Sequence, residues 1–152
     1  MARGITGSCL CAAVGFEIDA AHTPIELCHC PRCRKATGAA FAATFYVRAG
    51  SFRWLRGEEQ IGVFDAPIRE RPPAYRRVFC RLCGSSLPLL NRSAGYAEIP
   101  AGLLDQDPGV RPVRQIFTAR KAAWFEPSTQ LPAHPEHVAP SDHLLARLLG
   151  GS

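Results

Sequence analysis

The sequence predicts a mainly β protein built of small antiparallel sheets, with a short helix near its C-terminal end. Roughly eight short runs of alternating or apolar residues are separated by turn residues, which is the pattern of short strands. Glycine and proline number 13 each, a share that is too high for a helical bundle. No helical crossover stands between the predicted strands, so a parallel βαβ sheet is not expected.

Length and composition indicate one domain. The chain has 152 residues, of which 47% are hydrophobic and 20% charged, enough to form a buried core. We expect a single domain over residues 1–152, with its core in about 4–126 and an irregular tail and helix in 127–152. No apolar run approaches the roughly 20 residues of a membrane span, and the first residues lack the apolar stretch of a secretory signal. The expected location is therefore the cytoplasm.

The clearest predicted strand begins at Val14. There Val14, Phe16 and Ile18 lie on one face and polar residues or glycine on the other. The remaining strands share this alternation or a short apolar run, and they are 25–27, 41–48, 52–55, 61–65, 77–79, 87–90 and 96–99. The last two form a hairpin around residues 91–95, and shorter apolar pieces follow at 115–117 and 124–125.

Two helical pieces are expected. Residues 34–37 form one helical turn that Gly38 closes, because glycine readily takes the left-handed conformation that ends helices. Residues 142–149 form a helix with Ser141 as its cap and a stop at Gly150. The leucines of this last helix form one apolar stripe, which we expect to pack on this domain or on a second subunit.

Seven cysteines, an odd number, are the most informative feature of the composition. They cannot all pair within one chain, and a reducing compartment disfavours structural disulfides. Closely spaced cysteines in such a protein more often bind metal or take part in chemistry. They form a first pair (Cys9, Cys11), a triad (Cys28, Cys30, Cys33) and a second pair (Cys80, Cys83).

These spacings predict zinc sites. The cysteines of the second pair stand two residues apart before Gly84, in a turn that lets both sulfurs face one ion. Their partners are either the first pair or two members of the triad. Because three sulfurs within six residues can wrap an ion by themselves, a division into four and three uses all seven cysteines. A closed four-thiolate site is structural, whereas three protein ligands leave a position for water or substrate.

Other interpretations of these residues are open at this point. The first pair could be ordinary buried thiols, and Cys30 with Cys33 could form a redox dithiol. His29 could close the triad as a fourth ligand, although its place between two cysteines aims it away from the ion. Trp124 could cover a site or fill a core. The basic stretch from Arg69 to Arg77 is interpreted as a solvated face that could also hold an anionic substrate.

Four segments together carry a family signature: residues 7–11, residues 28–35 followed by Gly38 and Phe41, residues 79–85, and residues 115–124. They resemble the family of glutathione-dependent formaldehyde-activating enzymes, which also includes centromere protein V. The resemblance extends from Gly7 to about Trp124. Two positions depart from the family pattern, since Ala12 stands where glycine is usual and Gln115 where histidine is usual.

The resemblance implies a β-tent fold of small antiparallel sheets around a structural zinc, with two zinc ions per chain. It implies that the structural zinc is held by Cys9, Cys11, Cys80 and Cys83. It implies a catalytic zinc at an open site held by Cys28, Cys30 and Cys33. The reaction it implies joins a small-molecule thiol such as glutathione to an aldehyde, formaldehyde, and is classed as that of a carbon–sulfur lyase.

Chemistry of the triad agrees with such a reaction. Zinc at an open three-thiolate site lowers the pKa of a thiol that takes the fourth position, and the thiolate can attack an aldehyde carbonyl. We expect Arg34 and Lys35 to offset the negative charge that gathers there.

Three other function classes compete with a zinc-dependent enzyme. A non-catalytic thiol or glutathione carrier would use the same open zinc, and a structural protein would hold two inert zincs. A zinc-ribbon-like nucleic-acid module is suggested by the net charge of +5 and the pI of about 9.0. If all seven thiols ionised around two zinc ions, the net charge of the protein would fall to only about +2. No basic recognition helix is expected either. We therefore expect small-molecule partners, and neither nucleic acid nor a membrane.

Overall fold

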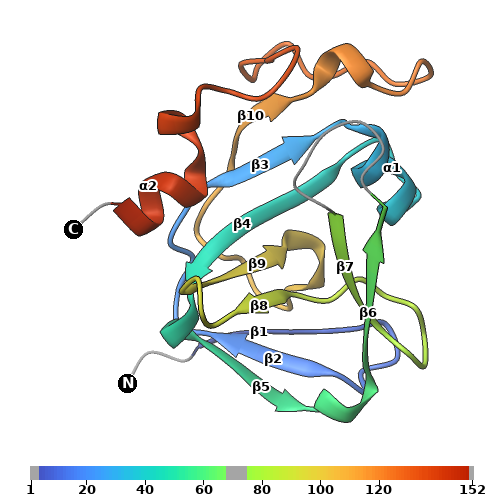
Figure 1. Ribbon diagram of the computed structural model, residues 1–152, viewed down its shortest axis with the longest axis vertical. Helices are drawn as coiled ribbons and strands as arrows, with labels where there is room; N and C mark the ends of the chain where they lie inside the picture. The colour runs from blue at the N-terminus through green and yellow to red at the C-terminus, as the bar shows by residue number, and fades with distance from the viewer. Residues whose placement is uncertain (1–3, 68–74, 151–152) are drawn as a thin grey trace.

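The computed structural model describes residues 4–67 and 75–150, and these form three small sheets and two short α-helices (Figure 1). The three-stranded antiparallel sheet has the order β1 (Ile5–Ser8), β2 (Gly15–Ile18), β5 (Phe52–Arg56). The five-stranded sheet has the order β10 (Pro112–Ile116), β3 (Ile25–Cys28), β4 (Ala42–Arg48), β9 (Tyr96–Pro100), β8 (Leu89–Asn91). The two-stranded sheet pairs β6 (Ile61–Ala66) with β7 (Tyr75–Cys80). The helices are α1 (Pro31–Thr37) and α2 (Leu144–Gly150).

The prediction of a mainly β protein with a short C-terminal helix is confirmed. Single 3₁₀ turns join several of these elements, at Ala49–Ser51, Glu58–Gln60, Ala101–Leu103, Thr118–Arg120 and Pro140–Asp142. Among the described residues, no helix has the length and apolar character needed to cross a membrane.

Element boundaries differ from the prediction at both ends of the chain. The sequence analysis missed β1, whose Gly7 lies against the ring of Phe16 on β2 and leaves no room for a side chain. The last helix begins at Leu144 rather than at residue 142, because a separate 3₁₀ turn, Pro140–Asp142, precedes it. Ser141 lies inside that turn, so its predicted role as a helix cap is wrong.

One strand pair corrects the expectation of purely antiparallel sheets. β10 runs parallel to β3, with Arg114 opposite Glu26 and Ile116 opposite Cys28. β9 already runs in the direction of β3, because both are antiparallel to β4. The connection over residues 101–111 carries the chain back along the sheet, so β10 starts from the same end as β3. A turn and loop therefore replace the helical crossover that is usual between parallel strands.

The main core lies between the three-stranded sheet and one face of the five-stranded sheet. Every second residue of these strands points into the core, as we predicted for the apolar face of residues 14–18. They are Phe16, Ile18, Ile25, Leu27, Phe45, Val47, Phe52, Ala97 and Ile99. The other face of the five-stranded sheet carries the intervening residues, and these are free to line a functional site.

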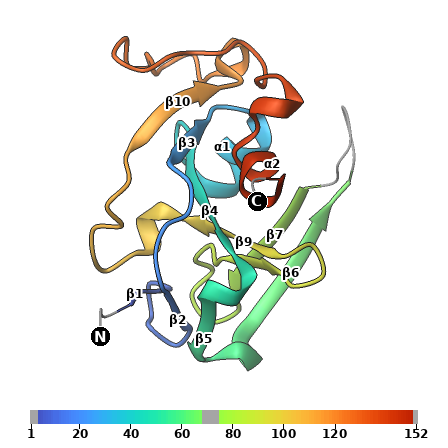
Figure 2. The ribbon, with the colours of Figure 1, turned by 90° about the vertical axis from the view of Figure 1, so that its left-hand side faces the viewer.

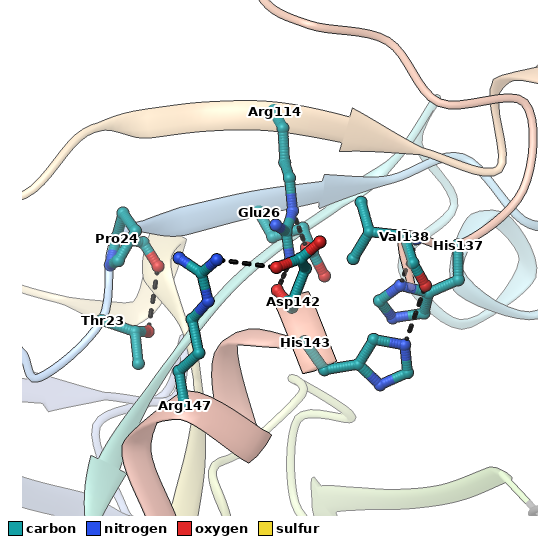
Figure 3. A network of polar contacts seen from close by, with 9 residues as sticks. All are labelled: Thr23, Pro24, Glu26, Arg114, His137, Val138, Asp142, His143 and Arg147. Carbon is teal, nitrogen blue, oxygen red and sulfur yellow. Dashed lines mark hydrogen bonds and ion pairs between the residues drawn. The ribbon is translucent and has the colours of Figure 1, made fainter. Parts of the chain in front are cut away.

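The C-terminal tail is tied to the edge of the five-stranded sheet through Arg114 of β10, which also forms a buried ion pair with Glu26 of β3 (Figure 3). Arg114 Nε lies 2.6 Å from Glu26 Oε2, and the two side chains are only 13% and 9% exposed. The same guanidinium donates to the backbone carbonyl of Asp142, just before α2. Arg48 on β4 donates to the carbonyl of Leu148 at the other end of the helix. Leu144 and Leu148 are buried, so these two leucines of α2 pack on their own chain, while Leu149 is 47% exposed.

We expect Arg114→Met to lower the free energy of unfolding by about 3 kcal/mol, because it leaves the Glu26 carboxylate buried without its partner. Chemical denaturation followed by circular dichroism measures this loss. Arg111→Met is the matched control, since Arg111 pairs with Asp107 at the surface, where an ion pair contributes at most about 1 kcal/mol. Equal losses in the two variants would show that the buried pair stabilises the fold no more than a surface pair does.

Candidate metal centres

The first and second cysteine pairs meet in one four-sulfur cluster. Their Sγ atoms all lie within 4.8 Å of one another. Cys9 Sγ is 3.6 Å from Cys11 Sγ, which is 3.9 Å from Cys80 Sγ. A tetrahedral zinc site with bonds of about 2.3 Å places its sulfurs about 3.8 Å apart. The cluster therefore has the size and donor set that fit a zinc ion.

Each of the two turns that carry these cysteines contains a residue in the left-handed conformation. Cys9 and Cys11 lie between β1 and β2, in a turn where Ala12 takes the left-handed conformation with φ of 64°. This explains why glycine is usual at that position in the family that the sequence resembles. Gly84 takes the same conformation after the second pair, with φ of 77°. A hydrogen bond from the Ser85 hydroxyl to Cys83 Sγ lowers the pKa of that thiol to about 5, so it ionises readily for metal binding.

The triad forms a second cluster at the junction of β3 and α1. Cys28 ends β3, Cys30 is the N-cap of α1, and Cys33 lies in the second position after Pro31. Their Sγ atoms also lie within 4.8 Å of one another. Proline at the first helical position and Gly38 in the left-handed conformation set the two ends of α1. The helix therefore begins earlier than predicted, which turns Cys33 back toward Cys28 and Cys30.

The triad thiols interact strongly with one another. Cys30 Sγ accepts a hydrogen bond from the backbone N–H of Cys33 at 3.4 Å. Hydrogen bonds from the Cys28 and Cys33 side chains lower the pKa of Cys30. The same contacts raise the pKa of Cys33. All described cysteines are free, so the structure presents three thiols rather than a Cys30–Cys33 disulfide. Three converging sulfurs, one of them readily ionised, fit a three-ligand metal site.

His29 does not join the triad, so the alternative of a fourth ligand is wrong in this structure. Its side chain is fully buried, and its Nε2 lies 3.0 Å from Gln115 Oε1. The ring stacks on Phe125 and packs against Phe41, while Nδ1 is buried without a hydrogen-bond partner. Among the described residues, the triad therefore offers three candidate metal ligands and no fourth.

Gln115 holds this buried histidine, a role that the sequence analysis did not assign. Its side chain is 1% exposed, and its Nε2 donates to the carbonyl of Ser128 in the tail. In the sequence, glutamine at position 115, where the family usually has histidine, was the signal that could have indicated this role. Trp124, in contrast, is 75% exposed and fills no core.

A cleft of about 1000 Å³ opens over the triad. Its floor is the free face of the five-stranded sheet, with Cys28 of β3, Thr44 and Tyr46 of β4, and Glu98 of β9. The opposite wall includes Tyr75 of β7, and Figure 1 shows the β6–β7 sheet standing beside the larger one. The triad is thus exposed to a space large enough for a small peptide, whereas the four-sulfur cluster does not line it.

The positive charges beside the triad differ from those predicted. Arg32, between Cys30 and Cys33, lines the cleft, and its guanidinium lies 5.7 Å from the centre of the Tyr75 ring. Arg34 lines neither of the two described cavities, and Lys35 lines a neighbouring cavity of about 570 Å³ that also reaches Cys30. Arg32 therefore takes the place in the cleft that we expected of Arg34.

The basic stretch from Arg69 to Arg77 is described only in part, because Arg69 and Arg71 lie outside the described residues. Arg76 forms a surface ion pair with Asp65 at 2.7 Å. Arg77 donates to the carbonyls of Ala36 and Gly84, and so connects α1 with the second-pair turn. Within the described part, Arg76 and Arg77 are therefore engaged in contacts with their own chain and do not form a free basic face.

Two acidic groups and three tyrosines share the cleft. Burial raises the pKa of Glu98 to about 7, and the negative charge of Glu26 adds to this effect. Burial also raises the pKa of Tyr46 and of Tyr75, so both phenols stay protonated at neutral pH. Tyr96 also lines the cleft. The cleft therefore offers neutral hydrogen-bond donors beside a carboxyl group that titrates near neutrality.

The fold and the two sulfur clusters define a class: a mainly β protein with one four-cysteine and one three-cysteine candidate metal centre. A family model described as glutathione-dependent formaldehyde-activating enzyme matches residues 4–120. The chain therefore belongs to this family.

Other comparisons add the fold alone. The crystal structure of a protein from Rhodobacter sphaeroides aligns with a TM-score of 0.51 at 22% identity. The alignment covers 71% of this chain and 99% of that chain. No curated protein sequence matches this chain.

Proposed function

We propose that this protein is a zinc-dependent enzyme of the carbon–sulfur lyase type, acting on the adduct of a thiol and an aldehyde. The family suggests glutathione and formaldehyde as the pair. One observation carries the proposal: three converging cysteine sulfurs line a cleft of about 1000 Å³, and no fourth protein ligand closes them among the described residues. In this proposal Cys28, Cys30 and Cys33 hold a catalytic zinc.

The structural counterpart is a second zinc held by Cys9, Cys11, Cys80 and Cys83. These ligands come from two segments, the β1–β2 turn and the turn after β7, so the ion would join the three-stranded sheet to the β6–β7 sheet as in a β-tent fold. We propose that residues 1–152 form one domain with its core in about 4–126, on which the tail over residues 127–152 packs. Seven free thiols fit a reducing cytoplasm.

The mechanism assigns separate tasks to the cleft residues. When bound at three thiolates with one open position, zinc lowers the pKa of a substrate thiol, which then reacts as a thiolate. Carbon–sulfur bond formation moves the carbonyl electron pair onto oxygen, which takes up the proton that the thiol released. Tyr75 keeps its proton and can donate a hydrogen bond to that oxygen, while Arg32 offsets negative charge at the triad.

A binding assay alone would not separate this enzyme from a thiol carrier. Adduct formation that is faster with protein than without it supports an enzyme, whereas saturable thiol binding without acceleration supports a carrier. Persistent DNA binding above physiological salt would instead support the nucleic-acid module. The buried position of His29 away from the triad argues against two inert zincs.

We expect two zinc ions per chain in protein purified in reductant without added metal, one of which mild chelation removes. The open site has three protein ligands and faces the cleft, whereas Cys9 and Cys80 of the four-sulfur site are fully buried. Elemental analysis before and after chelation measures both numbers. One zinc that resists chelation would remove the triad as a standing metal site and would favour a redox or structural role for it.

A further inference from the structure

Glu98 is a carboxyl group in the cleft that nothing in the described structure uses. It lies on β9 between Ala97 and Ile99, which face the core, so its own side chain faces the cleft. Glu26, on the same face, is neutralised by Arg114 at 2.6 Å. The Glu98 carboxyl makes no hydrogen bond or ion pair with any described residue. The side chain is partly exposed, so its carboxyl faces the cleft without a protein partner and is available to a ligand there.

The surroundings of Glu98 favour a cation. Tyr46 of β4 and Leu89 of β8 flank it in the sheet. Besides the triad and Glu98 itself, the ionisable groups of the cleft are Glu26, Arg32, Tyr46, Tyr75, Arg76, Arg77, Arg92, Tyr96 and His137. Arg76 is engaged by Asp65, and Arg77 by the carbonyls of Ala36 and Gly84. Arg32 lies over the Tyr75 ring, and Arg92 is exposed at the turn after β8. No described cation lowers the pKa of Glu98, whereas the negative charge of Glu26 raises it.

The register of the sheet gives the distance between Glu98 and the triad. Cys28 pairs with Ala42, and Glu98 pairs with Tyr46, four residues further along β4. Four residues along a strand and two strand spacings across place the two Cα atoms about 16 Å apart. The ammonium and the sulfur of an extended peptide thiol such as glutathione are up to about 10 Å apart, and the side chains of Glu98 and Cys28 shorten the gap further. A single amino acid is too short to reach both.

We propose that Glu98 binds the ammonium group of an extended, peptide-like thiol whose sulfur lies at the triad. This inference rests on the proposed function, because it requires a thiol at Cys28, Cys30 and Cys33. It narrows the substrate class to thiols that carry a primary ammonium at peptide-like distance from sulfur. Small neutral thiols would reach the triad but would leave Glu98 without a partner.

The interaction has a defined pH dependence. Burial and Glu26 raise the pKa of Glu98 to about 7, so the carboxyl is largely neutral at about pH 6 and largely ionised at about pH 8. An ammonium ligand binds the ionised form more tightly. The preference for a thiol with an ammonium group should therefore rise with pH across this range, and it should not rise when residue 98 is glutamine.

Isothermal titration of the zinc-loaded protein tests the inference with two ligands. They are glutathione and its analogue in which hydrogen replaces the amino group. We expect wild-type protein to bind glutathione about tenfold more tightly than the analogue, as a charge-assisted hydrogen bond allows. Glu98→Gln should remove this preference and leave binding of the analogue unchanged. Glu59→Gln, at an exposed site outside the cleft, is the matched control.

Three results would overturn the inference. They are equal affinities of wild-type protein for the two ligands, an unchanged preference in Glu98→Gln, or an equal loss for both ligands in that variant. Zinc content and thermal unfolding of Glu98→Gln show whether the variant keeps its fold. Amino-dependent binding without accelerated adduct formation would overturn the catalytic part of the proposed function, while the thiol at the triad, on which this inference rests, would stand.

Discussion

Cys30→Ser is expected to abolish adduct formation and to release one of two zinc ions while the fold stays intact. Cys30 Sγ is buried at the base of α1 and is the triad thiol that ionises most readily. Serine cannot replace a thiolate as a zinc ligand, because its hydroxyl stays protonated. Two protein ligands would remain, and neither the open metal position nor the activation of a substrate thiol would survive.

The helix should tolerate this change. Cys30 is the N-cap of α1, and its sulfur accepts a hydrogen bond from the N–H of Cys33. Serine is among the best N-cap residues, so its hydroxyl can take over that bond. Activity, zinc content and circular dichroism are measured on the same preparation, with Glu59→Gln as the active control. A folded variant with full activity would contradict the catalytic site, and an unfolded variant would show that the triad is structural.

The predictable part of this protein is the part that local patterns encode. Alternation placed Val14, Phe16 and Ile18 on one buried face, and all three are fully buried. The hairpin between β8 and β9 lies where turn residues separate two apolar runs. The division of the cysteines into four and three follows from spacing, and the structure brings the same two groups together. Strand alternation, the hairpin and the triad each depend on a few consecutive residues, whereas the meeting of the two distant pairs was reached from the number of cysteines and the ligands that zinc needs.

The features that were missed depend on distant segments. The parallel pairing of β10 with β3 joins residues about 90 positions apart, and its buried pair Arg114–Glu26 has no local signature. The alternation in residues 96–99 places Glu98 opposite the core, but a single strand cannot show whether its polar face meets water or a cleft. Only the neighbouring β6–β7 sheet turns that face into the wall of a site. Gln115 is similar, since its partners His29 and Ser128 come from two other segments.

Cys83→Ser is expected to have the opposite effect to Cys30→Ser and to destabilise the whole fold. The four-sulfur cluster joins the β1–β2 turn to the end of β7, about 70 residues away. The fully buried apolar residues around it are few: Val14 and Leu87 beside Cys9 and Cys80, with Ala13, Trp54, Ile61, Val78 and Cys83 only partly buried against them. A core of this size cannot hold the two sheets together without the ion, whose binding free energy is also folding free energy.

The expected loss is most of the free energy of unfolding, because structural zinc contributes about 10 kcal/mol or more while a domain of this size is stable by about 5–15 kcal/mol. Thermal unfolding and zinc content measure it. Leu82→Ser is the matched control, because Leu82 lies in the same turn and is 64% exposed, so its loss should change stability by about 0.5 kcal/mol or less. If Cys83→Ser melts at the wild-type temperature, the four cysteines do not form the site that holds these sheets together. If it unfolds while Cys30→Ser stays folded, the two sulfur clusters have separate roles, one in stability and one in chemistry.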